Sequence, residues 1–444
     1  MITRLRKTPV ILCALLCWLA MTTQAQSSAP IEVKPEPISQ ENQQEQKKTT
    51  QDSETKKTDP QRQRIVDPAT MPKPDPKTNK PPGSTLDRGI TRFENSKALE
   101  KLKVYFSHPI VHPRFGGIGD GSGFGLGVEF TNNVSKSPNL KLSALLHGTF
   151  RRYLLTSAGI SVDPTRGGRE RFQLDFTGRY QLRPREQFYG LGPDSLRSNR
   201  SNYNLQERGF NFASVFKPTK SLRLGAGLDF SSTRIFDGTD NRFAKTPKLF
   251  PALPGIARGA SLLSPQIFIE FDQRNDKGNT TKGVYANLMA SSNDSVGKDD
   301  FGFVNLKLDA RGYLPLGTPR RVLAARLIGN FNNEKGGSHI PFFRLARLGD
   351  AQTLRGYRPF RFYGRNALAA NLEYRFELIP GIGALAFTDV GQVFDRRAQL
   401  SAQGLHATWG GGVEFKSKKS TMFRILVGKS GEGTRLIFGF GQTF

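Results

Sequence analysis

The chain has 444 residues and a formal net charge of +27 at pH 7, because 65 Lys and Arg residues outnumber 38 Asp and Glu residues. Both cysteines, Cys13 and Cys17, lie near the N-terminus. Disulfides, thiolate metal ligands and a cysteine nucleophile are therefore excluded from the rest of the chain. No apolar run of about 18 residues occurs after residue 100, so the sequence predicts no transmembrane helix there.

Residues 1–25 have the pattern of a cleavable secretory signal peptide. Arg4 and Lys7 precede an apolar run from Val10 to Met21, and a small-residue cleavage site ends at Ala25. The apolar run is too short to span a bilayer. We therefore expect an exported protein whose mature form contains no cysteine.

Residues 26–98 are predicted to be a disordered leader in the periplasm. The segment is rich in proline, glutamine and charged residues, and its first aromatic residue is Phe93. Such a composition cannot bury enough apolar surface to offset the entropy of ordering. The leader can be interpreted as a spacer or as a docking tail for a periplasmic partner.

Most of the net positive charge lies after residue 100. A basic excess of this kind favours an anionic partner, and an exported chain meets little nucleic acid. Outer-membrane lipid or lipopolysaccharide headgroups, or an anionic solute in a pore, are the partners that remain. A solvated basic rim without a specific partner is the alternative.

Residues 99–444 show the alternation of apolar and polar residues that is typical of β-strands. In Asn371–Leu378, for example, Glu373 and Arg375 lie on one face and Leu372 and Tyr374 lie on the other. The same division recurs in Gly123–Phe130, Arg171–Tyr180, Leu222–Phe230 and Asn305–Leu314. This pattern predicts an all-β fold.

A transmembrane antiparallel barrel is favoured over a soluble sandwich by two features. The polar face is rich in charges and glycines, as expected for a water-filled lumen, and short connections alternate with long ones. The short connections are predicted at Lys217–Ser221 and Gly317–Arg320, and the long ones at Arg185–Asn204, Thr233–Ser261 and Asn332–Asn366. At least fourteen strands are predicted and sixteen are favoured, with two further strands before Gly116 and through a break at Arg151 and Arg152.

The chain is predicted to end on a strand in which Phe438, Phe440 and Phe444 occupy alternate positions. A terminal aromatic residue on an amphipathic strand resembles the signal by which outer-membrane barrels are recognised for insertion. These three residues are therefore candidates for a C-terminal insertion signal, and the barrel assembly machinery is the partner expected to read it.

The stretch Pro341–Asp395 is the most informative part of the sequence. It contains Arg355-Gly356-Tyr357, then a strand with Glu373, then Phe387-Thr388-Asp389-Val390-Gly391. In this ordered set the chain resembles the BamA/TamA, or bacterial surface antigen, family of outer-membrane barrels. A second Arg-Gly-Tyr at Arg311 lies in an alternating strand, so the tripeptide alone is not specific.

The resemblance implies a loop that folds back into the barrel and is locked there. Arg355 would be the loop arginine, with Gly356 and Tyr357 beside it, and Glu373 and Asp389 would be its acidic partners. Alternation supports this independently, since Glu373 lies on a charged face and Asp389 shares a face with Gly391. A guanidinium can hold two carboxylates at once, which lysine cannot do.

The function that the resemblance implies is assembly or transport at the outer membrane, meaning insertion or translocation of a client protein or lipid. Members of the assembly type carry periplasmic POTRA domains, and residues 26–98 are too short for a set of these. Two alternatives therefore stay open: a gated anion-preferring pore, and an anchor that tethers periplasmic partners. We expect no enzymatic activity, no cofactor and no metal, because no residue spacing singles out such a site.

Overall fold

The computed structural model describes residues 110–136, 139–164, 171–297, 299–402, 404–416, 421–442 and 444. The predicted signal peptide and leader lie outside the described residues, so both stay predictions. In the part that is described, no helix is both long enough and apolar enough to cross a membrane.

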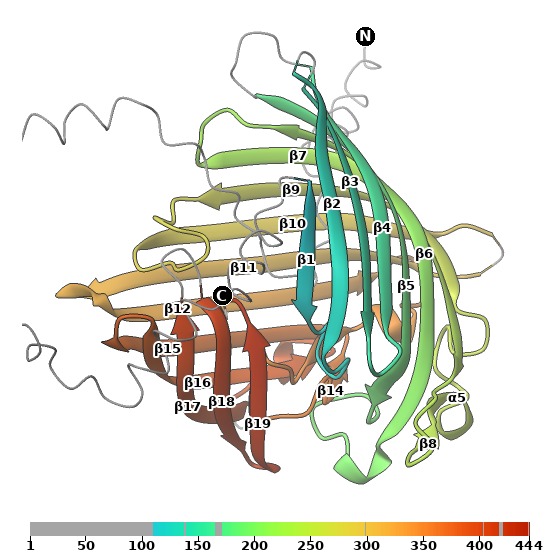
Figure 1. The fold of residues 1–444 in the computed structure, drawn as a ribbon. Helices are drawn as coiled ribbons and strands as arrows, with labels where there is room; N and C mark the ends of the chain where they lie inside the picture. The colour runs from blue at the N-terminus through green and yellow to red at the C-terminus, as the bar shows by residue number, and fades with distance from the viewer. Residues whose placement is uncertain are drawn as a thin grey trace, which may run out of the picture. The chain divides into compact units, whose positions relative to one another are not determined.

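The described chain forms an all-β, nearly closed barrel of sixteen antiparallel strands (Figure 1). Each strand pairs with the next one in the sequence. The strands are β1 (Val111–Gly116), β2 (Gly125–Lys136), β3 (Asn139–Thr149), β4 (Leu154–Asp163), β5 (Phe172–Phe188), β6 (Ser201–Phe216), β7 (Leu222–Asp237), β9 (Ala260–Asp272), β10 (Gly283–Ser295), β11 (Gly302–Leu316), β12 (Thr318–Glu334), β15 (Asn366–Ile379), β16 (Ile382–Phe394), β17 (His406–Lys416), β18 (Thr421–Ser430) and β19 (Gly433–Phe440). The predicted fold class and the favoured strand count are confirmed.

The two faces of the strands differ as the alternation predicts. On β15, the Leu372 and Tyr374 side chains are exposed on the outside, whereas Glu373 and Arg375 are buried in the barrel interior. Apolar side chains therefore cover the outer wall where lipid would lie, and charged side chains line the lumen. The two strands that the sequence left open are also present, as β1 and as the β3–β4 pair joined through residues 150–153.

The connections differ in length between the two ends of the barrel. At one end, here called the turn end, β6 and β7 are joined by residues 217–221 and β11 and β12 by Gly317 alone, whose φ of +74° suits glycine. At the other, the loop end, the connections 189–200, 238–259 and 335–365 are long. The asymmetry has exceptions, since residues 273–282 form a long connection at the turn end.

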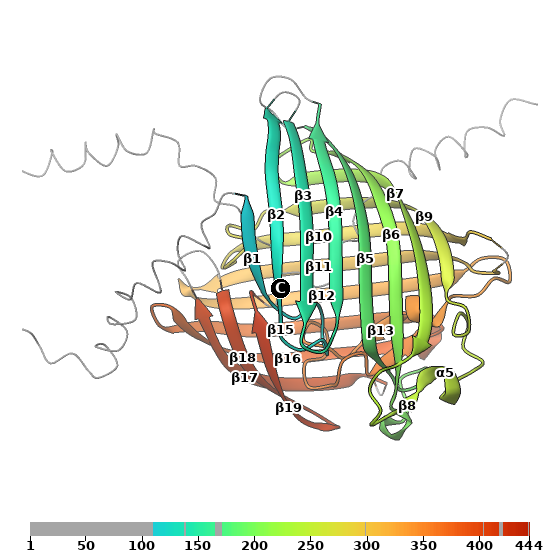
Figure 2. The same ribbon diagram turned by 45° about the vertical axis from the view of Figure 1, so that its right-hand side comes forward.

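Short elements occur within the connections of the loop end, and Figure 2 shows β8 and α5 beside the end of β6. They are η2 (Arg197–Asn199), β8 (Ala244–Lys245), α5 (Thr246–Leu249), η3 (Phe342–Arg344), β13 (Ala346–Leu348), β14 (Phe362–Gly364) and η4 (Arg397–Gln399). Because β5, β6, β7 and β9 extend beyond their predicted ends, the irregular loops are shorter than the sequence indicated.

Residues 335–365, here called the internal loop, supply much of the interior packing. The hairpin of β13 and β14 stands at its base, where Ala346 pairs with Gly364. Aromatic residues from the loop pack against the barrel wall. Two clusters result, one around Phe342, Phe343 and Tyr363 and one around Leu354, Tyr357 and Phe362.

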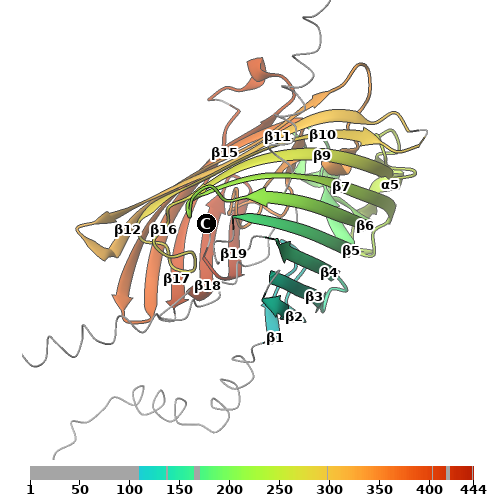
Figure 3. The same ribbon diagram turned by 90° about the horizontal axis from the view of Figure 1, so that it is seen from above.

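The ladder runs from β1 to β19, and residues of these two strands are in contact. Figure 3 shows the barrel from above, with β1 below β19 in the picture. The Phe440 ring lies 6.0 Å from the Phe124 ring between centroids. A Cβ at Gly116 would lie 2.7 Å from the same Phe440 ring, so a side chain at this position would collide with it. We call the boundary between β1 and β19 the seam.

The predicted C-terminal alternation is only partly correct. Phe438 is exposed on the outer face of β19, but the strand ends at Phe440, and Gly441 turns the chain with a φ of +72°. Phe444 is instead buried against Tyr313, Val322 and Ala324. Its placement on the strand face was wrong, because strand alternation cannot anticipate a glycine turn into the lumen. The role of these phenylalanines as an insertion signal stays a prediction.

Candidate functional site

The internal loop reaches the barrel wall through a tight turn at Asp350. The Asp350 carboxylate accepts hydrogen bonds from the Gln352 N–H at 2.8 Å and the Thr353 N–H at 2.7 Å. Such a side-chain cap replaces backbone bonds and fixes the turn. Gly349, with a φ of +94°, precedes it. The turn directs Arg355 toward β15 and β16.

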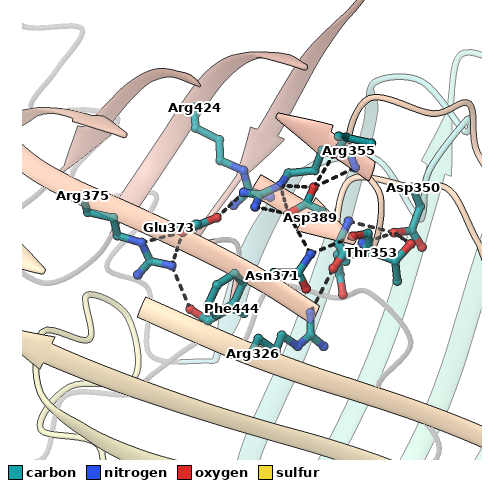
Figure 4. Close-up of polar contacts among 12 residues, drawn as sticks. Arg326, Asp350, Thr353, Arg355, Asn371, Glu373, Arg375, Asp389, Arg424 and Phe444 are labelled. Carbon is teal, nitrogen blue, oxygen red and sulfur yellow. Dashed lines mark hydrogen bonds and ion pairs between the residues drawn. The ribbon is translucent and has the colours of Figure 1, made fainter. Parts of the chain in front are cut away.

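Arg355 is fully buried and contacts both predicted acidic partners (Figure 4). Its Nη1 donates to the Glu373 carboxylate, and its Nη2 and Nε donate to Asp389, the latter at 3.0 Å from Oδ2. The backbone N–H of Arg355 also donates to Asp389 Oδ2, at 3.0 Å. We call Arg355, Glu373 and Asp389 the loop lock.

Each carboxylate of the loop lock has further donors. Asp389 accepts from Asn371 Nδ2 at 2.8 Å and from Thr408 Oγ1 at 3.0 Å. Glu373 accepts from Arg375 Nε at 2.7 Å. A buried ion pair is stabilising only when its remaining polar atoms are satisfied, and this network meets much of that requirement.

The guanidinium of Arg355 also lies over an aromatic ring. Its Cζ is 3.7 Å from the centroid of Phe387, which comes from β16. A Cβ at Gly410 on β17 would lie 2.7 Å from Phe387 Cζ, so the absence of a side chain there makes room for the ring. Planarity lets the guanidinium stack on the ring while its edge donates to the carboxylates, which a lysine ammonium could not do.

Gly356 and Tyr357 continue the loop along β18 and β19. A Cβ at Gly356 would lie 2.8 Å from the carbonyl of Lys429, and the Gly356 carbonyl accepts from Ser430 Oγ at 3.1 Å. The Tyr357 ring is buried against Phe362, with 5.1 Å between ring centroids. Both residues therefore fix the loop against the last strands.

Of the six residues predicted for the locked loop, five meet in this place, and Gly391 does not. Gly391 instead packs against β15, where an added Cβ would lie 2.9 Å from the Leu368 carbonyl oxygen. The sequence did not assign Asn371, Arg375, Phe387 or Thr408 to the site. For Asn371 and Arg375 a signal existed, since both share the face of Glu373, whereas Thr408 lies on another strand and carried none. Arg311, in the second Arg-Gly-Tyr, lies within β11 and pairs with Asp309 at 2.6 Å.

A sixteen-stranded barrel with an apolar outer wall and an inward-folded loop defines the class of outer-membrane β-barrels. Within that class the chain belongs to the Omp85 superfamily, because the Omp85 superfamily domain matches residues 148–444. Members of this family are generally non-enzymatic membrane barrels. No curated protein matches the sequence.

Solved structures with similar folds include BamA from Haemophilus ducreyi lacking POTRA domains 1–3, with a TM-score of 0.53 at 15% identity. That match covers 80% of this chain and 81% of the other. CdiB from Escherichia coli matches with a TM-score of 0.49 at 13% identity, over 75% of this chain and 60% of that one. At these identities the BamA likeness concerns the fold alone, and it agrees with the resemblance that the sequence indicated.

Proposed function

We propose that this barrel inserts or translocates protein or lipid clients at the outer membrane by opening at the seam, with the internal loop as its gate. The observation that carries the proposal is the loop lock, in which Arg355 is buried between Glu373 and Asp389. The contacts that join Arg355 to the wall are bonds to side chains, so they can be exchanged without unfolding the barrel. A gate needs two such discrete arrangements.

The local chemistry of the seam supports an opening there. β1 has only six residues and ends at Gly116, and Gly125 and Gly127 face it from β2. Glycine lowers the stability of a strand because it has no side chain to pack. The first hairpin is therefore the part of the wall that costs least to displace.

The orientation in the membrane follows from the connection lengths. Outer-membrane barrels place short turns in the periplasm and long loops outside. The turn end and residues 26–98 would then face the periplasm, and the loop end would meet lipopolysaccharide. The proposal therefore includes contact of the loop end with lipopolysaccharide and a protein or lipid client.

Depletion of the protein tests the proposal directly. We expect altered outer-membrane protein or lipid composition after depletion, with restoration by the wild-type chain and not by Arg355→Ala. Arg311→Ala is the matched control, because it removes a lumen arginine from the second Arg-Gly-Tyr. Unchanged protein and lipid composition after depletion would contradict an assembly role.

An anion-preferring pore is the second candidate, supported by the basic excess of the folded part. Several lumen arginines are already neutralised, as in the Arg179–Asp229 and Arg326–Asp309 pairs at 2.6 and 2.8 Å. Planar-bilayer recordings separate the two functions. A pore predicts conductance steps that increase when Arg355→Glu releases the loop, and silence in both proteins would exclude it.

A further inference from the structure

Three segments that are distant in sequence meet beside the seam, at the loop end of the barrel. Asp120 lies in the connection 117–124 between β1 and β2, and its Oδ2 accepts from the Ala351 N–H of the internal loop at 2.6 Å. Arg435, on β19, donates to the same Oδ2 from Nη2 at 3.3 Å. Its Nη1 donates to the Tyr357 carbonyl at 2.7 Å. One ion pair thus joins both sides of the seam to the loop.

The loop contacts of this ion pair flank the loop lock. Ala351 and Tyr357 lie on either side of Arg355 in the sequence, so Asp120 and Arg435 hold the two ends of the segment that carries it. A release of the segment would break both contacts together. Conversely, movement of β19 away from β1 would withdraw Arg435 from the Tyr357 carbonyl.

The connection that carries Asp120 is held in a defined shape. Ser122 Oγ donates to the Gly119 carbonyl at 2.6 Å and accepts from the Ile118 N–H at 3.0 Å. Arg151 donates to the Gly121 carbonyl at 2.8 Å. These bonds pre-organise the turn, so Asp120 is presented to the loop at little further cost in entropy.

The charge of Asp120 depends on Arg435. Burial and then the nearby Asp350 carboxylate raise the pKa of Asp120, whereas Arg435 and the Ala351 N–H lower it. Without Arg435, the Asp120 and Asp350 carboxylates would lose the cation that offsets their repulsion, which favours separation of the segments. A neutral side chain at position 120 would not suffer this repulsion.

We propose that Arg435 is a positioning residue that couples the seam to the internal loop, by neutralising Asp120 and holding the Tyr357 carbonyl. The seam then stays closed while the loop is locked, and it opens when the loop is released. This inference rests on the proposed function and names its regulation.

The test is a distance measurement across the seam in the full chain reconstituted in phospholipid nanodiscs. Spin labels are placed at Val128 on β2 and Leu436 on β19, which are both exposed on the outer face. The only native cysteines are Cys13 and Cys17, and both are replaced by serine so that only the introduced cysteines are labelled. Heat-modified migration in gels verifies that each variant is a folded barrel.

Arg435→Gln is expected to add a population longer by about 5 Å or more, the spacing of one strand. Asp120→Asn alone is expected to leave the distance unchanged, because an amide oxygen still accepts from the Ala351 N–H. Asp120→Asn added to Arg435→Gln removes the repulsion but not the loss of the Tyr357 contact, so it should return a large part of the population to the short distance. Arg223→Gln, which breaks the 2.8 Å ion pair with Glu270 away from the seam, is the matched control and should have no effect.

A second readout follows the loop through Gln352→Cys. The rate at which this cysteine reacts with a water-soluble maleimide should increase in Arg435→Gln and should be lower again in the double variant with Asp120→Asn. A folded Arg435→Gln barrel with an unchanged distance overturns the proposal, and so does a widening that Asp120→Asn does not reduce. Because no client is present, these outcomes are independent of the depletion experiment.

Discussion

Arg355 contacts Glu373 and Asp389 together because its guanidinium has a donor for each carboxylate. Arg355→Ala would leave Glu373 and Asp389 buried without their main cation. Removing one partner of a buried ion pair costs about 3–5 kcal/mol. We therefore expect the loop to leave the wall while the barrel stays folded, and the maleimide reaction of Gln352→Cys to become faster.

Two control variants sharpen the Arg355 prediction. Arg355→Lys keeps the charge but loses the planar fork, so we expect partial release. Arg311→Ala removes the arginine of the second Arg-Gly-Tyr, whose partner is Asp309, and should leave the loop in place. An equal response to Arg355→Ala and Arg311→Ala would contradict a specific lock.

We expect Asp389 to contribute more than Glu373 to keeping the internal loop against the barrel wall. Asp389 accepts from the backbone and side chain of Arg355 and from Asn371 and Thr408, whereas Glu373 shares its charge between Arg355 and Arg375. Asp389→Asn places amide donors against existing donors and should release the loop more than Glu373→Gln. The comparison is the rate at which Gln352→Cys reacts with maleimide in the Asp389→Asn and Glu373→Gln proteins. A faster reaction in Glu373→Gln than in Asp389→Asn would refute this prediction.

At the scale of elements, the loop is seated on β18 as well as on β15 and β16. Gly356→Ala would bring a Cβ to 2.8 Å from the Lys429 carbonyl, so the loop must shift away. Overpacking of this kind costs about 1–3 kcal/mol. We expect faster maleimide reaction of Gln352→Cys in this variant, with the barrel still folded.

Gly312, in the second Arg-Gly-Tyr, provides the control for the Gly356→Ala variant. A Cβ at Gly312 on β11 meets nothing within 4 Å, so Gly312→Ala should leave both the loop and the barrel unchanged. Equivalent behaviour of the two glycine variants would mean that contact with β18 does not hold the loop.

At the scale of the whole molecule, the barrel could be predicted from sequence because its strands carry a local signal. Alternation in segments such as Asn371–Leu378 assigns each residue to the lumen or to the outer wall, and even the two weaker strands were anticipated. The inward position of Phe444 could not be predicted in this way. It depends on a turn at Gly441 and on a pocket formed by β11 and β12, which are far away in the sequence.

The candidate site shows the same difference between residues that a local pattern marks and residues that only a long-range contact brings in. Arg355, Glu373 and Asp389 were identified from an ordered motif and from strand parity, and the structure brings them together. Thr408 and the Asp120–Arg435 pair were not identified, because nothing local marks them. Asp120 and Arg435 are 315 positions apart and meet only when the barrel closes. Contacts across the seam are therefore the part of the site that requires a structure.

The proposed opening makes a prediction for the seam as a unit. Phe124 and Phe440 face each other across it, so Phe124→Cys and Phe440→Cys can be bridged by a short, reducible bifunctional thiol reagent. We expect the bridged protein to keep its barrel fold and its loop position but to lose complementation of a depleted strain. Reduction of the bridge should restore it.

The matched control for this bridge is Val128→Cys with Leu146→Cys. These residues are direct partners on β2 and β3, where no opening is proposed, and both are exposed on the outer face. The control bridge should leave complementation intact. If the seam bridge also leaves complementation intact, clients do not pass between β1 and β19, and a route through the lumen past a released loop becomes the better account. If both bridges abolish complementation, the loss reflects a general effect of cross-linking on the wall, and the seam has no special role.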